Sequence, residues 1–495
     1  MPARVSSEHV DVLVVGAGLS GIAAAYHLQA RLPRKSLVVL EGRDRMGGTW
    51  DLFRYPGVRS DSDMQTLGYG FRPWRGDKAL ADGASIAAYI ADTARAFGLD
   101  RHIRYGHRVT RAAWSSADAL WSVEVERGGE ALRFTCGFLF MCSGYYDYAS
   151  GHRPDWPGAE DFAGQVVHPQ FWPADLDYAG KRVVVIGSGA TAVTLVPAMA
   201  DAAAHVTMLQ RSPTYVVTRP NRDPFAAKVQ KRLPPRLADT VLRWKNVLQS
   251  IYFYTLARRK PERVAAAIIG FAQKQLGRDY DVARHFTPTY KPWDQRLCLV
   301  PDGDLFRAIR SGKASVVTDT IERFTPGGIR LSSGEELAAD VVVTATGLNV
   351  KLMGGMAVEV DGAAVDFGRC LSYKGMMFSG VPNFALALGY TNASWTLKCE
   401  LTAAYVCRLL AHMDRRGQAI CVPERGVEGG DAGPALDLTS GYVKRAAGLL
   451  PKQGAARPWR VHQNYISDMA AMRFGRVDDG VMRFAPRPAA ARRAA

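Results

Sequence analysis

The stretch "VDVLVVGAGLSG", residues 10–21, decides the fold of this chain. Its first half is a β-branched run suited to a buried parallel strand. Its second half places Gly16, Gly18 and Gly21 in a Gly-x-Gly-x-x-Gly pattern ahead of the helix-like "IAAAYHLQA". Such glycines provide a tight turn, close backbone approach to a pyrophosphate, and close packing of helix on strand. The stretch therefore predicts a Rossmann-like unit whose helix N-terminus faces the phosphates of a dinucleotide.

A second strand supports this prediction. The run "SLVVLE", residues 36–41, ends at Glu41, about 20 residues past the last glycine, where a ribose-binding acid is expected. A carboxylate there accepts from the ribose 2′-hydroxyl and repels a 2′-phosphate. This half therefore suits FAD or NAD.

The pattern recurs in "RVVVIGSGATA", residues 182–192, with Gly187, Gly189 and Ala192. Its second strand, "HVTMLQRS", ends in Arg211 and Ser212 in place of an acid. Arginine can clamp a 2′-phosphate, which favours NADP(H) over NAD(H). The alternative is an ordinary exposed arginine at a strand end.

Two further apolar runs end in a glycine and are predicted as buried strands followed by a turn: "FLFMCSG" (138–144) and "DVVVTATG" (340–347). We expect an α/β fold with two Rossmann-like dinucleotide-binding domains, for FAD and NADP, and a helical insertion. The FAD-binding domain is expected at 1–145 and 335–495, and the NADP-binding domain at 146–212 and 291–334. Residues 213–290 have helical periodicity and form the insertion. The insertion can cap the active site, contact a second subunit or rest on lipid, and the sequence leaves these roles and the oligomeric state open.

The chain has 495 residues with a net charge of +16, and much of the excess falls in residues 228–264 and in the tail 485–495. Solvated helix faces explain this charge without nucleic acid, and peripheral contact with an anionic membrane is the alternative. There is no apolar run of signal-peptide or membrane-span length, so we expect a cytoplasmic protein. The seven scattered cysteines form no CxxC pair, which excludes a flavin disulfide reductase, and no metal site is predicted.

The segment between the two glycine patterns carries a family resemblance. Phe162, Gly164, His168 and Trp172, followed by a proline, resemble the FxGxxxHxxxW(P/D) fingerprint of Baeyer–Villiger monooxygenases. Related N- and S-oxidising flavin monooxygenases usually carry another aromatic in place of the tryptophan. As a connector between two nucleotide domains, the segment is expected to couple their positions. A histidine that acts as catalytic base and a plain surface connector are the alternatives.

The resemblance extends upstream to "GGTWDLFRYPGVRSD", residues 47–61, which contains Gly48, Thr49, Trp50 and Asp61. It covers nearly the entire chain, and segments such as "GYTNASWTLK" resemble a mycobacterial, thioamide-oxidising branch of the family. The resemblance implies FAD, NADPH and O2 as reactants, with a C4a-(hydro)peroxyflavin as oxidant. It also implies that ketones become esters or lactones and that thioethers and thioamides become sulfoxides.

The resemblance also implies the catalytic residues. Arg296, in "PWDQRLCLVPDGD", matches the family's catalytic arginine, and Asp61 matches its partner aspartate; Asp63 is the alternative partner. Arginine stays protonated at any working pH, and a buried guanidinium needs a carboxylate nearby. A surface pair with a neighbouring aspartate is the competing interpretation. Gln295 replaces a common family lysine, which puts strict preference for NADPH in doubt.

The resemblance places the loop before residue 396 near the flavin and the substrate. Asn392, Ser394 and Trp395 are therefore tentative substrate-pocket residues, together with Tyr145. For Trp395, an ordinary core position is an equal alternative. Two other function classes stay open: an N- or S-oxidising flavin monooxygenase without significant ketone oxidation, and a non-catalytic flavoprotein that acts as a redox-responsive binder.

Overall fold

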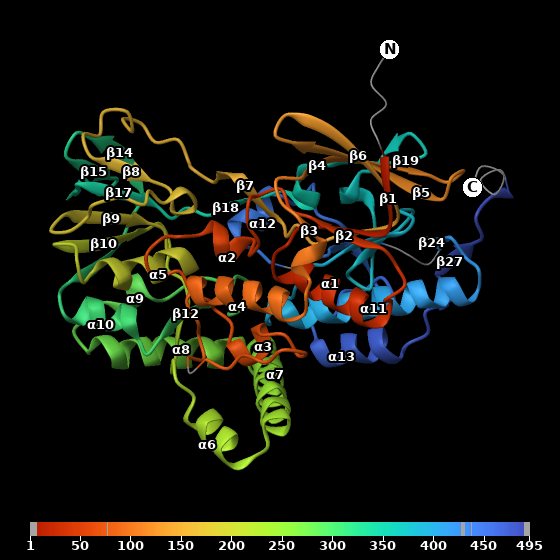
Figure 1. Ribbon diagram of the computed structural model, residues 1–495. Coiled ribbons are helices and arrows are strands. Elements are labelled where there is room, and N and C mark those ends of the chain that lie inside the picture. The colour runs from red at the N-terminus through yellow and green to blue at the C-terminus, as the bar shows by residue number, and fades with distance from the viewer. Residues whose placement is uncertain (1–6, 77, 427–430, 437, 490–495) are drawn as a thin grey trace.

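The computed structural model describes residues 7–76, 78–426, 431–436 and 438–489. Two sheets lie side by side, and the longer helices lie mostly below them in the view of Figure 1. The end of the basic tail, 490–495, falls outside the described residues. None of the helices in the described part of the chain has the length and apolarity needed to span a bilayer.

The larger sheet contains the first predicted strand, β1 (Ser7–Val15). Its other strands are β2 (Leu37–Leu40), β3 (Ile103–Arg104), β4 (Arg108–Ser115), β5 (Leu120–Arg127), β6 (Glu130–Met141), β19 (Ala357–Val360), β20 (Ala363–Ala364) and β23 (Phe384–Leu386). Their order is β20-β19-β4-β5-β6-β1-β2-β3, with β23 also paired to β6. Because β1 runs parallel to both β2 and β6, the glycine turn that follows it emerges at the carboxyl edge of the sheet, where dinucleotides bind.

Three helices cover this sheet from below in Figure 1: α1 (Leu19–Arg31), α4 (Gly83–Ala96) and α11 (Trp395–Arg415). Helices α1 and α11 pack against each other, and Ile22, Phe140 and Leu409 belong to the core that they share with the strands. Helix α11 is buried on most of its sides, although its sequence includes the charged residues Lys398, Glu400 and Arg408.

The smaller sheet is the second predicted nucleotide unit. It consists of β8 (Gln165–Val167), β9 (Arg182–Ile186), β10 (His205–Gln210), β13 (Ala314–Thr318) and β17 (Val341–Thr344), in the order β13-β10-β9-β17-β8. All of its pairings are parallel. Helices α5 (Ala190–Met199) and α10 (Asp304–Arg310) pack on it, and a three-stranded sheet of β14 (Ile321–Thr325), β15 (Gly328–Leu331) and β16 (Glu336–Ala338) adjoins it.

The predicted return to the first domain at residue 335 is wrong. Strand β17 lies in the second sheet, between β9 and β8. Its valines are fully buried on both faces, which is the environment of a central parallel strand. The chain returns only after Gly347, through β18 (Leu348–Val350), which pairs antiparallel with β7 (Tyr146–Gly151). The two segments that connect the sheets, β7 and β18, therefore lie side by side.

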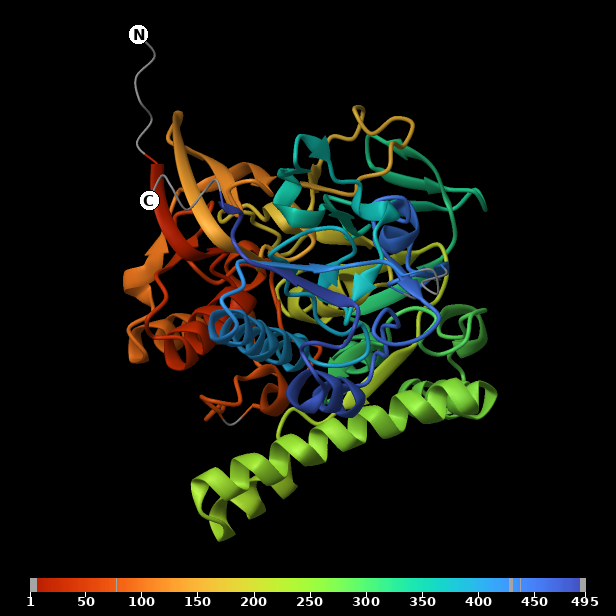
Figure 2. The same ribbon diagram turned by 90° about the vertical axis from the view of Figure 1, so that its right-hand side faces the viewer.

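The insertion is helical, as predicted, except at its start. Strand β11 (Val216–Arg219) pairs with β12 (Cys298–Pro301). Between them lie α6 (Pro224–Arg232), α7 (Pro235–Arg259), α8 (Pro261–Leu276) and α9 (Val282–His285). Figures 1 and 2 show α6 and α7, in yellow-green, below the rest of the molecule.

The remaining elements are short. They are α2 (Thr49–Leu52), α3 (Met64–Leu67), β21 (Ser372–Tyr373), β22 (Met377–Phe378), β24 (Ile420–Pro423), β25 (Asp431–Pro434), α12 (Gly441–Arg445), β26 (Lys452–Gly454), α13 (Tyr465–Met469) and β27 (Met482–Ala485). Single helical turns occur at Asp100–His102, Pro169–Phe171, Leu352–Gly355, Phe367–Arg369 and Ala470–Phe474.

Candidate functional site

The first glycine turn has the geometry that its sequence predicts. Gly16 has φ +102°, and a Cβ there would lie 2.7 Å from the carbonyl oxygen of Cys142. A Cβ on Gly21 would lie 1.8 Å from the carbonyl oxygen of Gly16, so only glycine lets α1 pack this close to the turn. Gly18 precedes the first residue of α1. The free N–H groups of the helix start are therefore available to an anion.

The "GGTW" segment forms a second wall beside this turn. Gly48 has φ +56°, and a Cβ there would approach the Cα of Gly18 to 3.2 Å. Thr49 and Trp50 follow in α2, and Thr49 Oγ1 lies 3.3 Å from the hydroxyl of Tyr148. The two glycine-rich segments thus meet through backbone alone, which leaves space for a ligand to approach their N–H groups.

Glu41 lies directly after β2 and is buried. Its carboxylate accepts hydrogen bonds from the backbone N–H of Ala17 at 2.8 Å and of Arg43 at 3.0 Å. Burial raises the pKa of this carboxyl group, and the two backbone donors oppose that shift. The acid is therefore fixed against the glycine turn, at the position predicted for ribose binding.

The second glycine turn is more open. Gly187 has φ +135°, and a Cβ there would lie 2.4 Å from the carbonyl oxygen of Ala345, whereas a Cβ on Gly189 would meet nothing within 4 Å. Gly189 precedes α5, and Ala192 is buried in the packing of that helix. Arg211 and Ser212 are exposed just after β10. This arrangement leaves the helix start and the arginine accessible on one side of the sheet.

The catalytic pair proposed from the sequence comes together. Nη1 of Arg296 lies 3.7 Å from Oδ2 of Asp61, and both side chains are 36% exposed. The nearby carboxylate of Asp61 raises the pKa of Arg296 further above its ordinary value, against the effect of burial. Asp294, one competing partner, instead forms an ion pair with Arg258 at 2.7 Å.

Asp63 has a different role from Asp61. It is buried, caps α3 by accepting from the backbone N–H of Thr66 at 3.0 Å, and also accepts from the Thr66 hydroxyl at 2.9 Å. Nη1 of Arg219 lies 3.6 Å from Oδ2 of Asp63, the oxygen that accepts from the Thr66 hydroxyl. The two aspartates of one short segment therefore serve the site and the fold respectively.

An aromatic group surrounds the arginine. The hydroxyls of Tyr145 and Tyr146 lie 3.1 Å apart, and the ring of Tyr145 stacks on Trp395 with a centroid distance of 5.4 Å. Tyr442 stacks on the other side of Tyr145 at 6.4 Å. Burial raises the pKa of Tyr146 to about 12, so this hydroxyl stays protonated beside the cation.

The three residues predicted for the substrate pocket near position 394 have other contacts. Trp395 begins α11, and its Nε1 donates to the hydroxyl of Ser20 at 2.8 Å. Asn392 and Ser394 are buried, and their side chains bond to the Gln463 carbonyl at 2.9 Å and to the hydroxyl of Thr66 at 2.5 Å respectively. Trp395 therefore reaches the aromatic group, while the other two hold the loop.

A cavity of about 400 Å³ lies beside this loop, and no sequence pattern indicated it. Its lining combines segments far apart in the chain, with Tyr254 and Thr255 from α7, Trp293 three residues before Arg296, Leu438, and Gln463. The rings of Tyr254 and Trp293 contact edge to face at 5.6 Å. Most of the other lining residues are polar, among them Arg460, His462, Asn464 and Ser467, so a bound molecule would meet many hydrogen-bonding groups beside the two aromatic rings.

The fingerprint segment lies against both crossings between the sheets. His168 Nε2 donates to the carbonyl oxygen of Gly347 at 3.3 Å, and Nδ1 accepts from the N–H of Gln170 at 3.2 Å. A Cβ on Gly151 would overlap the His168 ring. Burial lowers the pKa of His168. Both nitrogens of a neutral imidazole are therefore engaged in structural bonds.

The other fingerprint residues are structural. Phe162 is buried against Phe324, with ring centroids 6.0 Å apart. A Cβ on Gly164 would lie 2.4 Å from the carbonyl oxygen of Asp340. Trp172 packs near Tyr178 in the core of the smaller sheet.

The "RYPGVRSD" run joins the two halves, which sequence reasoning missed. Gly57 has φ +76°, and a Cβ there would lie 2.7 Å from the Cβ of Ala198 on α5. Arg59 forms an ion pair with Asp304 of α10 at 2.7 Å. Both contacts connect the segment that carries Asp61 to the second half. The glycine was the one sequence signal of such a close approach.

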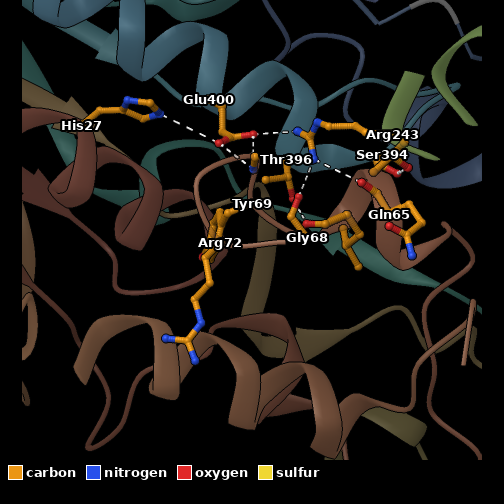
Figure 3. A network of polar contacts seen from close by, with 12 residues as sticks. His27, Gln65, Gly68, Tyr69, Arg72, Arg243, Ser394, Thr396 and Glu400 are labelled. Carbon is orange, nitrogen blue, oxygen red and sulfur yellow. Dashed lines mark hydrogen bonds and ion pairs between the residues drawn. The ribbon is translucent and has the colours of Figure 1, made fainter. Parts of the chain in front are cut away.

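A polar network ties the insertion to the first half (Figure 3). Glu400 of α11 accepts from Arg243 of α7 at 2.7 Å and from the backbone N–H of Gly70. Arg243 also donates to the carbonyl oxygens of Gln65 and Gly68. Nε2 of buried His27 points toward Glu400 from 3.9 Å. Helix α7 is therefore held to the flavin half by charged hydrogen bonds.

The chain matches two protein-family models. A family model described as flavin-binding monooxygenase-like matches residues 79–352, and one described as NAD(P)-binding Rossmann-like domain matches residues 14–76. The chain belongs to the flavin-binding monooxygenase-like family. The FAD-containing monooxygenase EthA of Mycobacterium tuberculosis (strain ATCC 25618 / H37Rv) is 56% identical over 484 residues, which cover 98% of this chain and 99% of that protein.

Two more likenesses support this assignment. The putative FAD-containing monooxygenase MymA of the same organism is 51% identical over 486 residues, covering 97% of this chain and 98% of that protein. A structure of oxidized steroid monooxygenase bound to NADP has a TM-score of 0.76 at 23% identity and covers 97% of this chain and all of that one. The family resemblance, the fold class with two Rossmann-like domains, and the assignment as a flavin-binding monooxygenase are confirmed.

Proposed function

We propose that this monooxygenase uses NADPH and O2 to insert one oxygen atom beside the carbonyl of ketones and to oxidise thioethers and thioamides to sulfoxides. The Arg296–Asp61 pair carries the proposal, because it places a permanent cation beside the aromatic side chains of Tyr145, Tyr146 and Tyr442. A monooxygenase that only oxidised soft nitrogen or sulfur atoms would have little use for such a cation.

The residues at the first glycine turn fit FAD. The start of α1 offers free N–H groups to the pyrophosphate, and Gly18 and Gly48 leave the backbone bare on both sides. Glu41 is fixed where the ribose hydroxyls of a dinucleotide lie. When bound, the reduced flavin supplies the activated oxygen that reaches the substrate.

The second half fits NADPH. Gly189 has open space above it at the start of α5, so a pyrophosphate can approach the helix N-terminus. Arg211 is exposed at the end of β10, with Ser212 after it. A guanidinium and a hydroxyl at this position suit a 2′-phosphate.

Arg296 has two tasks in this proposal. It supplies a positive charge that no working pH removes, because Asp61 raises its pKa. It also presents forked N–H donors to negative charge that develops during oxygen transfer. Asp61 is a positioning residue, since it contacts the guanidinium and holds it near Tyr145 and Tyr146.

His168 is proposed to position the two halves and not to move protons. Its ring bonds at both nitrogens and rests on β7 and on the turn before β18. A shift of one half relative to the other has to disturb these contacts. We infer that the fingerprint couples the placement of the nicotinamide half to that of the flavin half.

The test is product analysis of the FAD-loaded chain with NADPH, air, and a panel of ketones and thioethers. Esters or lactones from ketones are expected, with sulfoxides from thioethers. Sulfoxides without esters would assign the chain to the N- or S-oxidising class. Hydrogen peroxide with every substrate would contradict both oxygenase assignments and favour a redox-responsive binder.

A further inference from the structure

The outer face of the insertion exposes large apolar side chains. On α7, Leu237 is 50% exposed, Leu248 52%, Tyr252 62% and Phe253 54%. Phe225 of α6 and Phe271 of α8 are also exposed. Figure 2 shows α7 as a long rod outside the body of the two sheets. We call the side chains Phe225, Leu237, Leu248 and Tyr252 the insertion face.

Three members of the insertion face form a stripe along α7. At 100° per residue, Leu237, Leu248 and Tyr252 fall within about 60° of one another, because 11 and 15 residues are close to whole numbers of turns. The opposite side of α7 holds buried residues such as Leu242 and Asn246. The solvent-facing side of α7 therefore carries this apolar stripe, opposite the side that packs on the rest of the protein.

Basic side chains flank this stripe at both ends of α7. Lys228, Lys231, Arg232 and Arg236 are exposed before or at its start, and Arg259, Lys260 and Arg263 are exposed at or after its end. Residues 224–264 contain only two acids, Asp239 and Glu262. Of these, Asp239 is buried in an ion pair with Arg75.

We propose that the insertion face docks this enzyme on an anionic lipid surface, with α7 lying in the plane of the interface. Apolar side chains that enter the acyl boundary, flanked by lysines and arginines that contact headgroups, are the features of an interfacial helix. Each basic side chain near an anionic leaflet adds roughly fivefold to the partition. A second copy of this chain fits poorly, because a two-fold contact would bring the same basic residues together.

The cavity of about 400 Å³ gives the docking a consequence. Tyr254 and Thr255 line it, and they follow Tyr252 of the insertion face by two and three residues. The cavity near Trp293 therefore lies close to the C-terminal end of the apolar stripe. The substrate class that this geometry favours is a lipophilic ketone or thioether that partitions into the bilayer. This second statement rests on the proposed function, whereas the docking does not.

The docking is tested by sedimentation of the full-length, FAD-loaded chain with vesicles. Vesicles of phosphatidylcholine and phosphatidylglycerol should bind it, and vesicles of phosphatidylcholine alone should bind it at least about tenfold more weakly. Binding should fall as salt rises toward about 1 M, where screening acts within roughly 3 Å. Equal binding to both vesicles, or binding to neither, would overturn the proposal.

Matched variants locate the surface. Arg232→Gln/Arg236→Gln should weaken partition by about tenfold or more, while Arg127→Gln/Arg133→Gln removes the same charge from an exposed hairpin and should leave it unchanged. Leu248→Ser/Tyr252→Ser should weaken it similarly, and Leu449→Ser, at a residue of similar exposure outside the insertion, should not. A loss in both pairs alike, or a concentration-dependent dimer that the Leu248→Ser/Tyr252→Ser variant abolishes, would contradict lipid docking.

The substrate statement has its own readout. With a long-chain ketone carried in anionic vesicles, the Leu248→Ser/Tyr252→Ser variant should lose most of its rate, but with a short water-soluble ketone it should match the parent. If both rates are unchanged although vesicle binding is lost, delivery from lipid is wrong and docking stands. If no ketone reacts in any protein, the proposed oxygenation fails independently.

Discussion

The guanidinium of Arg296 lies 3.7 Å from the carboxylate of Asp61, whereas Asp63, two residues further on, is buried and caps a helix. In an extended segment, residues two positions apart point to the same face, so both aspartates would be expected to face the site. The cap of α3 decides otherwise, because it takes the second carboxylate into the protein and leaves the first at the site.

Replacing the arginine separates the two half-reactions. Arg296→Ala should retain reduction of FAD by NADPH and lose ketone oxidation by about 10²-fold or more, as expected when an oriented charge is removed from the reacting atoms. The measurements are anaerobic flavin bleaching and ester yield by gas chromatography. Ester formation at the parent rate would refute the catalytic role of Arg296.

Substitution of Asp61 should lower activity, whereas substitution of Asp63 should lower stability. Asp61→Asn should lower ketone turnover about 10- to 100-fold, because a charge-assisted contact of roughly 1.5–3 kcal/mol is lost, with little change in thermal stability. Asp63→Asn should instead lower the free energy of unfolding by about 1–2 kcal/mol through the weakened cap. Melting curves and initial rates for both variants decide the matter, and exchanged phenotypes would reverse the assignment.

Gly57 should be intolerant of a side chain. Gly57→Ala should destabilise the chain by about 2–4 kcal/mol, the sum of positive-φ strain and overpacking against α5. Gly98→Ala is the control, because Gly98 has φ +61° but open space around it, so only about 1–2 kcal/mol of strain is expected. Chemical denaturation gives both values. Equal losses would show that contact with Ala198 is unimportant.

Cofactor choice should depend on the end of β10. Arg211→Ala should reduce kcat/KM for NADPH by about tenfold or more while leaving NADH unaffected, because only NADPH carries the phosphate that the guanidinium binds. Gln295→Lys should shift preference toward NADPH. Steady-state kinetics with both nucleotides provide the test, and a parallel drop for NADH would point to a general structural effect.

Acid stability should depend on His27. Burial, with repulsion from Arg31 and Arg473, lowers its pKa from 6.5 to about 3. In the unfolded chain His27 therefore binds a proton near pH 6.5, whereas in the folded chain it binds one only near pH 3. Stability is full above pH 6.5 and falls by roughly 1.4 kcal/mol per pH unit below it.

The matched variant for this prediction is His27→Gln, which cannot titrate in this range. Between pH 6 and pH 4, its free energy of unfolding should change less steeply than that of the parent. The difference in slope should be that of one bound proton, about 1.4 kcal/mol per pH unit. Urea titrations at several pH values measure both slopes. An unchanged slope would mean that His27 is already protonated in the folded chain.

The cavity and the insertion illustrate what the sequence could not predict. Tyr254, Trp293, Leu438 and Gln463 meet only because α7, the segment before β12 and the C-terminal region fold over one another. No local pattern marks such a convergence. The family resemblance implied that Asn392 and Ser394 lie in the substrate pocket, but Nδ2 of Asn392 donates to the Gln463 carbonyl and the Ser394 hydroxyl bonds to that of Thr66.

The sequence by itself determined the two glycine turns and the acid after β2, because backbone conformation and phosphate binding each demand particular residue types at short spacing. The family resemblance supplied Arg296 and its candidate partners. Tertiary structure alone decided that Asp61 and not Asp63 meets Arg296, that β17 belongs to the second sheet, and that α7 borders both the cavity and the insertion face. Those outcomes depend on which segments pack against each other across long stretches of chain, and spacing along the chain carries no record of that competition.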